Sequence, residues 1–181
     1  MMFDGNFIPT DDLIAEADDY ARRSAPFTSN AHDFHEGGLA AKERKMAEGK
    51  YGEKAFKMIL QNNSVPFEED HTSHRERDKF DFLLTTPGRE YKVDVKTRTE
   101  DFHTRTLEIK AQADGPYRKD IYISAKLTRP HTIQFLGWFT RDDMLRANHV
   151  ENNGYLDNYV MYDNELRPMS ELETEIINNC I

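Results

Sequence analysis

The feature of this sequence that most constrains its fold is the segment 79–97, KFDFLLTTPGREYKVDVKT, in which two alternating runs flank a Pro-Gly pair. Alternation of polar and apolar residues is typical of β-strands that bury one face. Pro followed by Gly suits the two central positions of a β-turn, so the segment predicts a hairpin centred between Pro87 and Gly88. In that register Asp81 lies directly opposite Asp94. A bulge or an odd-length loop would shift the pairing and separate the two acids.

Strand alternation gives this hairpin one charged and one apolar face. Asp81, Asp94 and Lys96 are predicted to share the charged face. The apolar face is predicted to consist of Phe80, Phe82, Val93 and Val95. Carboxylates that face each other across two strands repel, so we expect a compensating positive charge. The alternative is an ordinary solvent-exposed sheet face, on which alternating Asp and Lys are common.

A divalent cation would offset this repulsion, because Mg²⁺ or Mn²⁺ binds carboxylates together with water and phosphate oxygens. Asp81 and Asp94 are the candidate metal ligands, and the main-chain carbonyl of Val95 is a third. Lys96 lies one alternation beyond Asp94. It is a candidate to orient an attacking water or to balance charge on the phosphorus.

A third acid, Glu53, lies in a segment of helical composition, residues 50–60. With a step of about 100° per residue, Glu53 falls about 20° beyond the apolar arc of this helix. The arc comprises Ala55, Phe56, Ile59 and Leu60. If the arc packs on the sheet, Glu53 can reach the two hairpin acids, where it could bind metal through water or hold Lys96. The alternative is an edge glutamate that turns to solvent or pairs with Lys57.

The rest of the chain predicts an α+β domain with a mixed sheet flanked by helices. Helices are expected at residues 10–23, at 39–62, from about 140 and from about 168. Strands are expected at 65–69, 79–84, 91–96, 120–127, 132–139 and 159–162. The length of 181 residues suits a single domain. We divide it into a peripheral helix and loop (1–40), a catalytic core (about 41–140) and a C-terminal extension (141–181).

The sequence G-E-K-A-F on a helix, then F-D-F-L-L, a short turn and V-D-V-K-T resembles the core of the PD-(D/E)xK, or restriction-endonuclease-like, nuclease superfamily. Glu53, Asp81, and Asp94 with Lys96 match the helix acid, the hairpin acid and the (D/E)xK pair in order. The resemblance covers roughly residues 50–140. It implies an αβββαβ core and Mg²⁺-dependent hydrolysis of phosphodiester bonds, usually in DNA. Two departures are the lack of a proline before Asp81 and an unclear crossover after the third strand.

The charge of the chain bears on a nucleic-acid partner. The formal net charge is −9, which weakens nonspecific binding to a polyanion. The acidic excess lies in residues 1–40 and 131–181, whereas the middle of the chain has a basic excess. The basic residues near the hairpin that could contact phosphates are Arg98, Arg105, Arg118, Lys119 and Lys126. Of these, we select Arg98 and Lys126 as the candidate nucleic-acid contacts.

Three functions remain open from the sequence: a DNA-cutting nuclease, a catalytically silent binding or scaffold protein of the same fold, and a nuclease for RNA or a restricted DNA structure. A homodimer that cuts both strands is also left open. The single cysteine, Cys180, cannot form an internal disulfide, and we expect a soluble, untargeted, cytoplasmic or otherwise intracellular protein with no membrane partner. The histidine pairs His32/His35 and His71/His74 lack partner cysteines and a convincing third ligand, so we interpret them as structural or surface residues rather than a zinc site.

Overall fold

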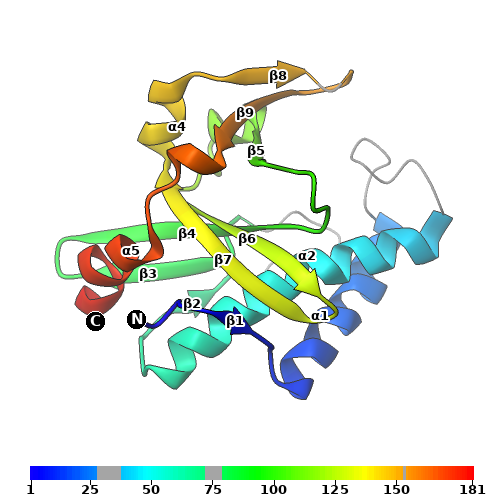
Figure 1. The fold of residues 1–181 in the computed structure, drawn as a ribbon, viewed down its shortest axis with the longest axis horizontal. Helices are drawn as coiled ribbons and strands as arrows, with labels where there is room; N and C mark the ends of the chain where they lie inside the picture. The colour runs from blue at the N-terminus through cyan, green and yellow to red at the C-terminus, as the bar shows by residue number, and fades with distance from the viewer. Residues whose placement is uncertain (28–37, 72–78, 153) are drawn as a thin grey trace.

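The computed structural model describes residues 1–27, 38–71, 79–152 and 154–181. In these residues the centre of the molecule is a mixed sheet with the strand order β1-β7-β6-β4-β3-β2. Its strands are β1 (Asn6–Phe7), β2 (Glu68–Glu69), β3 (Phe82–Thr86), β4 (Arg89–Arg98), β6 (Ile121–Arg129) and β7 (Thr132–Thr140). Helices pack against this sheet (Figure 1), so the predicted α+β class with a central mixed sheet is confirmed.

Two helices, α1 (Asp11–Ser24) and α2 (Gly38–Asn62), agree closely with the predicted ranges 10–23 and 39–62. The predicted apolar arc of α2 is buried in the main core together with Val93 and Val95 of β4. Figure 1 shows α1 beside α2 on the same side of the sheet. Although we expected α1 at the periphery, its Ala17 and Ala21 also belong to this core.

The β3–β4 hairpin has the register that the turn predicted. Phe82 pairs with Val93 and Thr86 pairs with Arg89, so the turn falls on residues 87 and 88. The ladder ends at Phe82, and Asp81 lies just before β3 rather than within it. Phe80 also precedes the strand and lines a surface hollow, so its predicted place on the apolar face is wrong. Beyond Val93, β4 is no longer paired with β3, although its other edge stays paired with β6 as far as Arg98.

β4 pairs with β6 in parallel, which requires a crossover between them. The crossover contains β5 (Arg105–Ile109) and the short helix α3 (Lys110–Ala113). β5 does not join the central sheet, and we did not predict it. It pairs instead with β9 (Asp157–Tyr162), which in turn pairs with β8 (Val150–Asn152).

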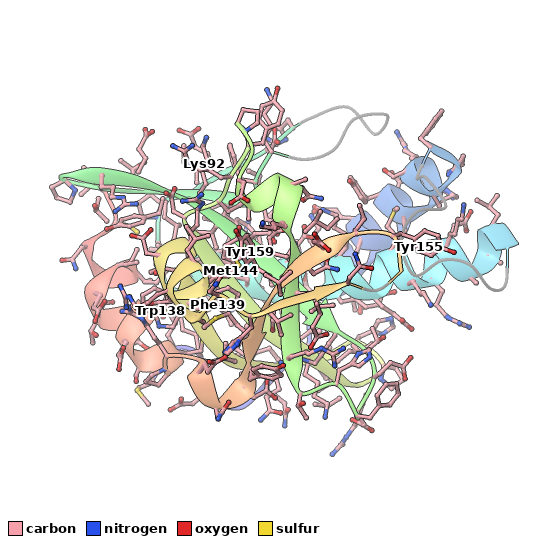
Figure 2. The ribbon with its side chains drawn as sticks, turned by 90° about the horizontal axis from the view of Figure 1, so that it is seen from above. Lys92, Trp138, Phe139, Met144, Tyr155 and Tyr159 are labelled. Carbon is pink, nitrogen blue, oxygen red and sulfur yellow. The ribbon has the colours of Figure 1, made fainter. Side chains whose placement is uncertain are left out.

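This second sheet packs with α4 (Arg141–Ala147) around a small core of its own. Figure 2 shows Phe139, Met144 and Tyr159 of that core gathered beside α4, while Tyr155 lies at the far end of the β8–β9 hairpin. The capped helix start predicted at Thr140 is confirmed, because Thr140 and Asp143 form a reciprocal capping box. The predicted last helix corresponds to α5 (Met169–Glu175).

In the described part of the chain, no helix has both the length and the apolar character that crossing a bilayer requires.

Candidate functional site

Strand β4 presents its charged residues on the face opposite the main core. Val93 and Val95 point into that core, so Asp94 and Lys96 must point away from it. Asp94 is 8% exposed even so. The Lys96 Nζ lies 2.7 Å from Asp94 Oδ2, and the Nζ of Lys119 lies 3.9 Å from Asp94 Oδ1. The outer face of β4 is therefore a largely buried cluster of charges.

Asp81 lies where the chain leaves the β3–β4 ladder. Its N–H donates to the Val93 carbonyl at 2.9 Å, and its Oδ2 accepts a hydrogen bond of 2.7 Å from the Val95 N–H. Since the N–H and C=O of one strand residue point to the same edge, the Val95 carbonyl also faces the Asp81 side. Asp81 thus occupies the strand edge that β3 leaves open.

A close helix–strand contact determines where Glu53 lies. A Cβ added to Gly52 would come within 1.9 Å of Thr97 Oγ1, so only glycine permits this approach of α2 to β4. The Thr97 hydroxyl donates to the carbonyl of Gly49 at 3.0 Å. The two contacts bring the helix backbone, and Glu53 with it, onto the strand that carries the site.

Glu53 and Asp81 line one hollow of about 490 Å³ between α1, α2 and the start of β3. Glu53 pairs with Lys50, at 2.7 Å, and not with Lys57 as the alternative interpretation supposed. Carboxylates outnumber basic groups in the lining. The ionisable residues there are Glu16, Asp19, Lys50, Glu53, Lys54, Lys57, Glu69, Asp70, His71 and Asp81.

A larger hollow, of about 640 Å³, lies beside the N-terminal half of α2 and the β6–β7 turn. Tyr51 lies in it, with its hydroxyl donating to Asp18 at 2.6 Å and its ring edge-on to His131. None of the predicted site residues lines this hollow. We therefore place the candidate site at β4 and not in the larger hollow.

The pKa of Asp81 reflects crowding by other acids. Burial raises the pKa of the Asp81 carboxyl well above its ordinary value, and the charges of Glu53 and Asp94 raise it further. The nearby Lys50 and the hydrogen bond from Val95 offset these effects only in part. The carboxylates of the helix and of both hairpin strands are thus close enough to repel one another.

The pKa of Asp94 is shifted in the opposite direction, below its ordinary value. Burial by itself would raise its pKa, but the ammonium groups of Lys96, Lys119 and Lys50 outweigh burial and hold the pKa below its ordinary value. Burial would likewise lower the pKa of Lys96, yet the carboxylates around it, chiefly Asp94 and Glu108, raise it. Asp94 and Lys96 therefore form an ion pair at neutral pH.

The donor set fits a hard divalent cation. Asp81, Asp94 and Glu53 offer carboxylate oxygens, and the Val95 carbonyl faces the same strand edge as Asp81. The crowding that raises the pKa of Asp81 is what a bound cation would relieve. Within the described ranges, however, no three His, Cys, Asp or Glu side chains already form a group that could hold a metal. The fit lies in the chemistry and placement of the donors and not in a preformed cage.

Sequence reasoning missed Glu108 of β5, which lies against Lys96. Glu108 is 2% exposed, and its Oε1 lies 3.6 Å from Lys96 Nζ. Lys119 was considered only as a phosphate contact, but it is 4% exposed and its ammonium faces Asp94. The polar–apolar alternation of RTLEI is a strand signal that could have indicated β5. Nothing local indicates which strand its glutamate faces.

The two predicted nucleic-acid contacts are both engaged within the protein. The Arg98 side chain is 8% exposed, and it donates to the His103 carbonyl at 2.7 Å and to Asp163 at 3.0 Å. The Arg98 guanidinium is thus held by groups of the protein itself, and its contact with a phosphate stays a prediction. Lys126 is 24% exposed and lies 2.8 Å from Asp101, whose own side chain is almost fully exposed. Such a pair can open at the surface, so Lys126 stays a candidate.

Of the histidines set aside as a zinc site, His71 is exposed and lines the hollow near Asp81. His32, His35 and His74 lie outside the described residues.

Comparison of the chain with protein-family models, with curated proteins and with solved structures returned no match.

Proposed function

We propose that this protein is a divalent-metal-dependent nuclease of the PD-(D/E)xK type, which hydrolyses phosphodiester bonds with DNA as the expected substrate. The observation that carries the proposal is the meeting of Asp81, Asp94 and Lys96 at the open edge and outer face of β4, with Glu53 brought close by α2. These residues come from three segments, in the order that the family resemblance implies.

The order of elements supports the proposal. The resemblance implies an αβββαβ core, and the chain has α2, β2, β3, β4, α3 and β6 in that order. β4 and β6 are parallel neighbours, as a crossover through a helix allows. The departure is β5, which is inserted before α3 and belongs to the second sheet.

The side chains divide the chemistry between them. Asp81, Asp94 and the Val95 carbonyl would hold the cation, with Glu53 as a further carboxylate. A bound Mg²⁺ or Mn²⁺ would polarise the phosphate and lower the pKa of a water. The Lys96 ammonium, held beside Asp94, is placed to orient that water or to stabilise negative charge that develops on the phosphate oxygens.

The acidic hollow favours a restricted substrate as a second candidate. Its excess of carboxylates would repel the phosphate backbone of a long duplex. An end, a flap or a short RNA needs few nonspecific contacts between the protein and the phosphate backbone. Two of its lysines, Lys54 and Lys57, are already paired with Glu16 and Glu69. A nuclease for a nucleic-acid end or branch is therefore the alternative that the described surface supports.

The test is cleavage by the purified protein of linear duplex, circular and single-stranded DNA and of RNA, with Mg²⁺ or Mn²⁺ against EDTA. We expect metal-dependent cutting that falls about 10²- to 10⁴-fold in Lys96→Ala, because a positioned group for proton transfer or charge stabilisation is lost. The substrate that is cut fastest distinguishes a nuclease that acts on duplex DNA from one that acts on a nucleic-acid end, a branch or RNA.

Lys92→Ala is the matched control. Lys92 lies on the same strand and face as Lys96, beside Leu83 of β3, and its removal should leave cleavage unchanged. Cutting that survives Lys96→Ala would place the activity at another site. Failure of the intact protein to cut any of these substrates would favour the catalytically silent binding protein, which a binding titration with the same nucleic acids would then examine.

A further inference from the structure

Strand β5 carries an internal carboxylate that the chemistry described so far does not use. Glu108 is 2% exposed, and its Oε1 accepts a hydrogen bond of 2.9 Å from the neighbouring Ile109 N–H. Its Oε2 has no hydrogen-bond partner among the described residues, and neither does the hydroxyl of Tyr122. A buried carboxylate is costly unless a positive charge compensates it. The nearest such charge is Lys96, 3.6 Å away.

The registers of three strands explain why Glu108 meets Lys96. In the parallel pair of β4 and β6, Asp94 lies beside Tyr122 and Lys96 lies beside Ser124. On β5, Thr106 and Glu108 share one face because they are two residues apart. The hydroxyls of Thr106 and Ser124 are hydrogen-bonded at 2.6 Å, so this face of β5 lies over β4 and β6.

The same placement puts Glu108 near Tyr122. Burial raises the pKa of the Tyr122 hydroxyl, and the adjacent charges of Glu108 and Asp94 raise it further. β5 is held in position by β9, in which Tyr159 pairs with Glu108. Strand β5 of the second sheet therefore places the Glu108 carboxylate against the outer face of β4, next to Lys96.

We propose that Glu108 is a positioning residue that holds the Lys96 ammonium over the site from the side of the second sheet. A cation bound to Asp94 would compete with Lys96 for the charge of that carboxylate, whereas Glu108 is not among the proposed metal ligands. Once Asp94 is engaged by metal, Glu108 keeps the long, flexible lysine side chain in place. The role of Glu108 in catalysis rests on the nuclease function proposed above, but its contact with Lys96 does not.

The first test is kinetic. Glu108→Gln keeps the size of the side chain and an acceptor for the Ile109 N–H but removes the charge. We expect kcat to fall about 10- to 100-fold, as when a supporting partner of a metal-site residue is lost, while KM and the melting temperature stay close to those of the wild type. Glu108→Asp, which retains the charge on a shorter arm, should recover part of the loss.

Two control variants separate positioning from folding. Thr106→Val removes the neighbouring hydrogen bond on the same face of β5, and Glu90→Gln neutralises an exposed glutamate on β4. Both should cleave at close to the wild-type rate. Wild-type kcat in Glu108→Gln would overturn the proposal, and so would an equal fall of kcat in Thr106→Val.

The second test does not depend on cleavage. Lysine labelled with ¹³C at the ε-carbon gives an NMR signal for Lys96, which is assigned by its disappearance in Lys96→Arg. We expect this signal to shift in Glu108→Gln and to stay in place in Glu90→Gln. An unshifted signal in Glu108→Gln would overturn the inference even if the protein is a nuclease. A shifted signal would support the contact even if no substrate is cut.

Discussion

The two faces of strand β4 differ in what they contribute to the protein. One face carries Val93 and Val95, which are buried against α2 in the main core. The other carries Asp94, which is also buried, and Lys96, which is partly exposed, and both are charged. A single alternating strand thus joins the hydrophobic core to a cluster of charged side chains.

The difference shows how stability on one face supports chemistry on the other. Burial of charges costs free energy, and mutual pairing recovers only part of it. The apolar face contributes the burial of hydrophobic side chains, which offsets that cost. Substitutions on the core face should therefore chiefly lower stability, whereas those on the charged face should change activity and the pH dependence of stability.

The largest expected effect on stability is at Phe82, the partner of Val93 across the hairpin, which is 1% exposed. Phe82→Ala should lower the free energy of unfolding by about 3–5 kcal/mol, because it leaves a cavity among packed aromatic rings. Urea unfolding followed by circular dichroism measures the change. Leu83→Ala, on the other face of the same strand, should cost much less. Equal losses in the two variants would break the distinction between the faces.

The next effect concerns the helix contact that positions Glu53. Gly52→Ala should cost about 1–3 kcal/mol, because the added methyl collides with Thr97 and forces α2 away from β4. Gly49→Ala is the matched control, since nothing lies within 4 Å of its added Cβ. It should stabilise the helix by up to about 1 kcal/mol.

A double variant tests whether Thr97 is the cause of the cost. Thr97→Ala removes the hydroxyl nearest to the added methyl, so Gly52→Ala should cost less in a Thr97→Ala background than in the wild type. If Gly52→Ala lowers the free energy of unfolding equally in both backgrounds, the contact with Thr97 is not the reason that glycine is required at position 52.

A third effect on stability has opposite signs at the two acids of the hairpin. In the metal-free protein, Asp94→Asn should lower stability at neutral pH by about 1–3 kcal/mol, because it leaves Lys96 with one partner fewer. Asp81→Asn should raise stability at the same pH, since its carboxyl is destabilised in the charged form by burial and by Glu53. Unfolding in EDTA at several pH values measures both changes.

The sign follows from linkage. The lowered pKa of Asp94 gives a contribution that is present above its unfolded pKa of about 3.9 and is lost as pH falls through the folded value. The raised pKa of Asp81 gives a contribution that is full below about pH 3.9 and is lost as pH rises through the folded value. Asp81→Asn should therefore reduce the loss of stability that occurs as pH rises above about 4. Stability changes of the same sign in Asp94→Asn and Asp81→Asn would contradict these electrostatic effects.

Much of this architecture could be predicted because it is local. A Pro-Gly turn and period-2 alternation determined the hairpin register, and the extents of α1 and α2 followed from their composition. The predicted direct pairing of Asp81 with Asp94 is not part of the ladder, because Asp81 lies just outside β3 and bonds to Val93 and Val95 instead. The prediction that Phe80 joins the apolar face was wrong, because the paired ladder begins only at Phe82, two residues after it. Strand alternation has no meaning beyond the last paired residue.

The sequence by itself therefore determined the hairpin, its two faces and the identity of the candidate acids and lysine, since neighbours along one strand or across a tight turn are set by backbone geometry. Only the tertiary structure decided that Glu108 faces Lys96, that Lys119 faces Asp94 and that Arg98 is taken up by Asp163. Those contacts depend on how a crossover and a second sheet pack on β4. Packing between distant segments is decided by the shape and burial of whole surfaces and not by any local pattern.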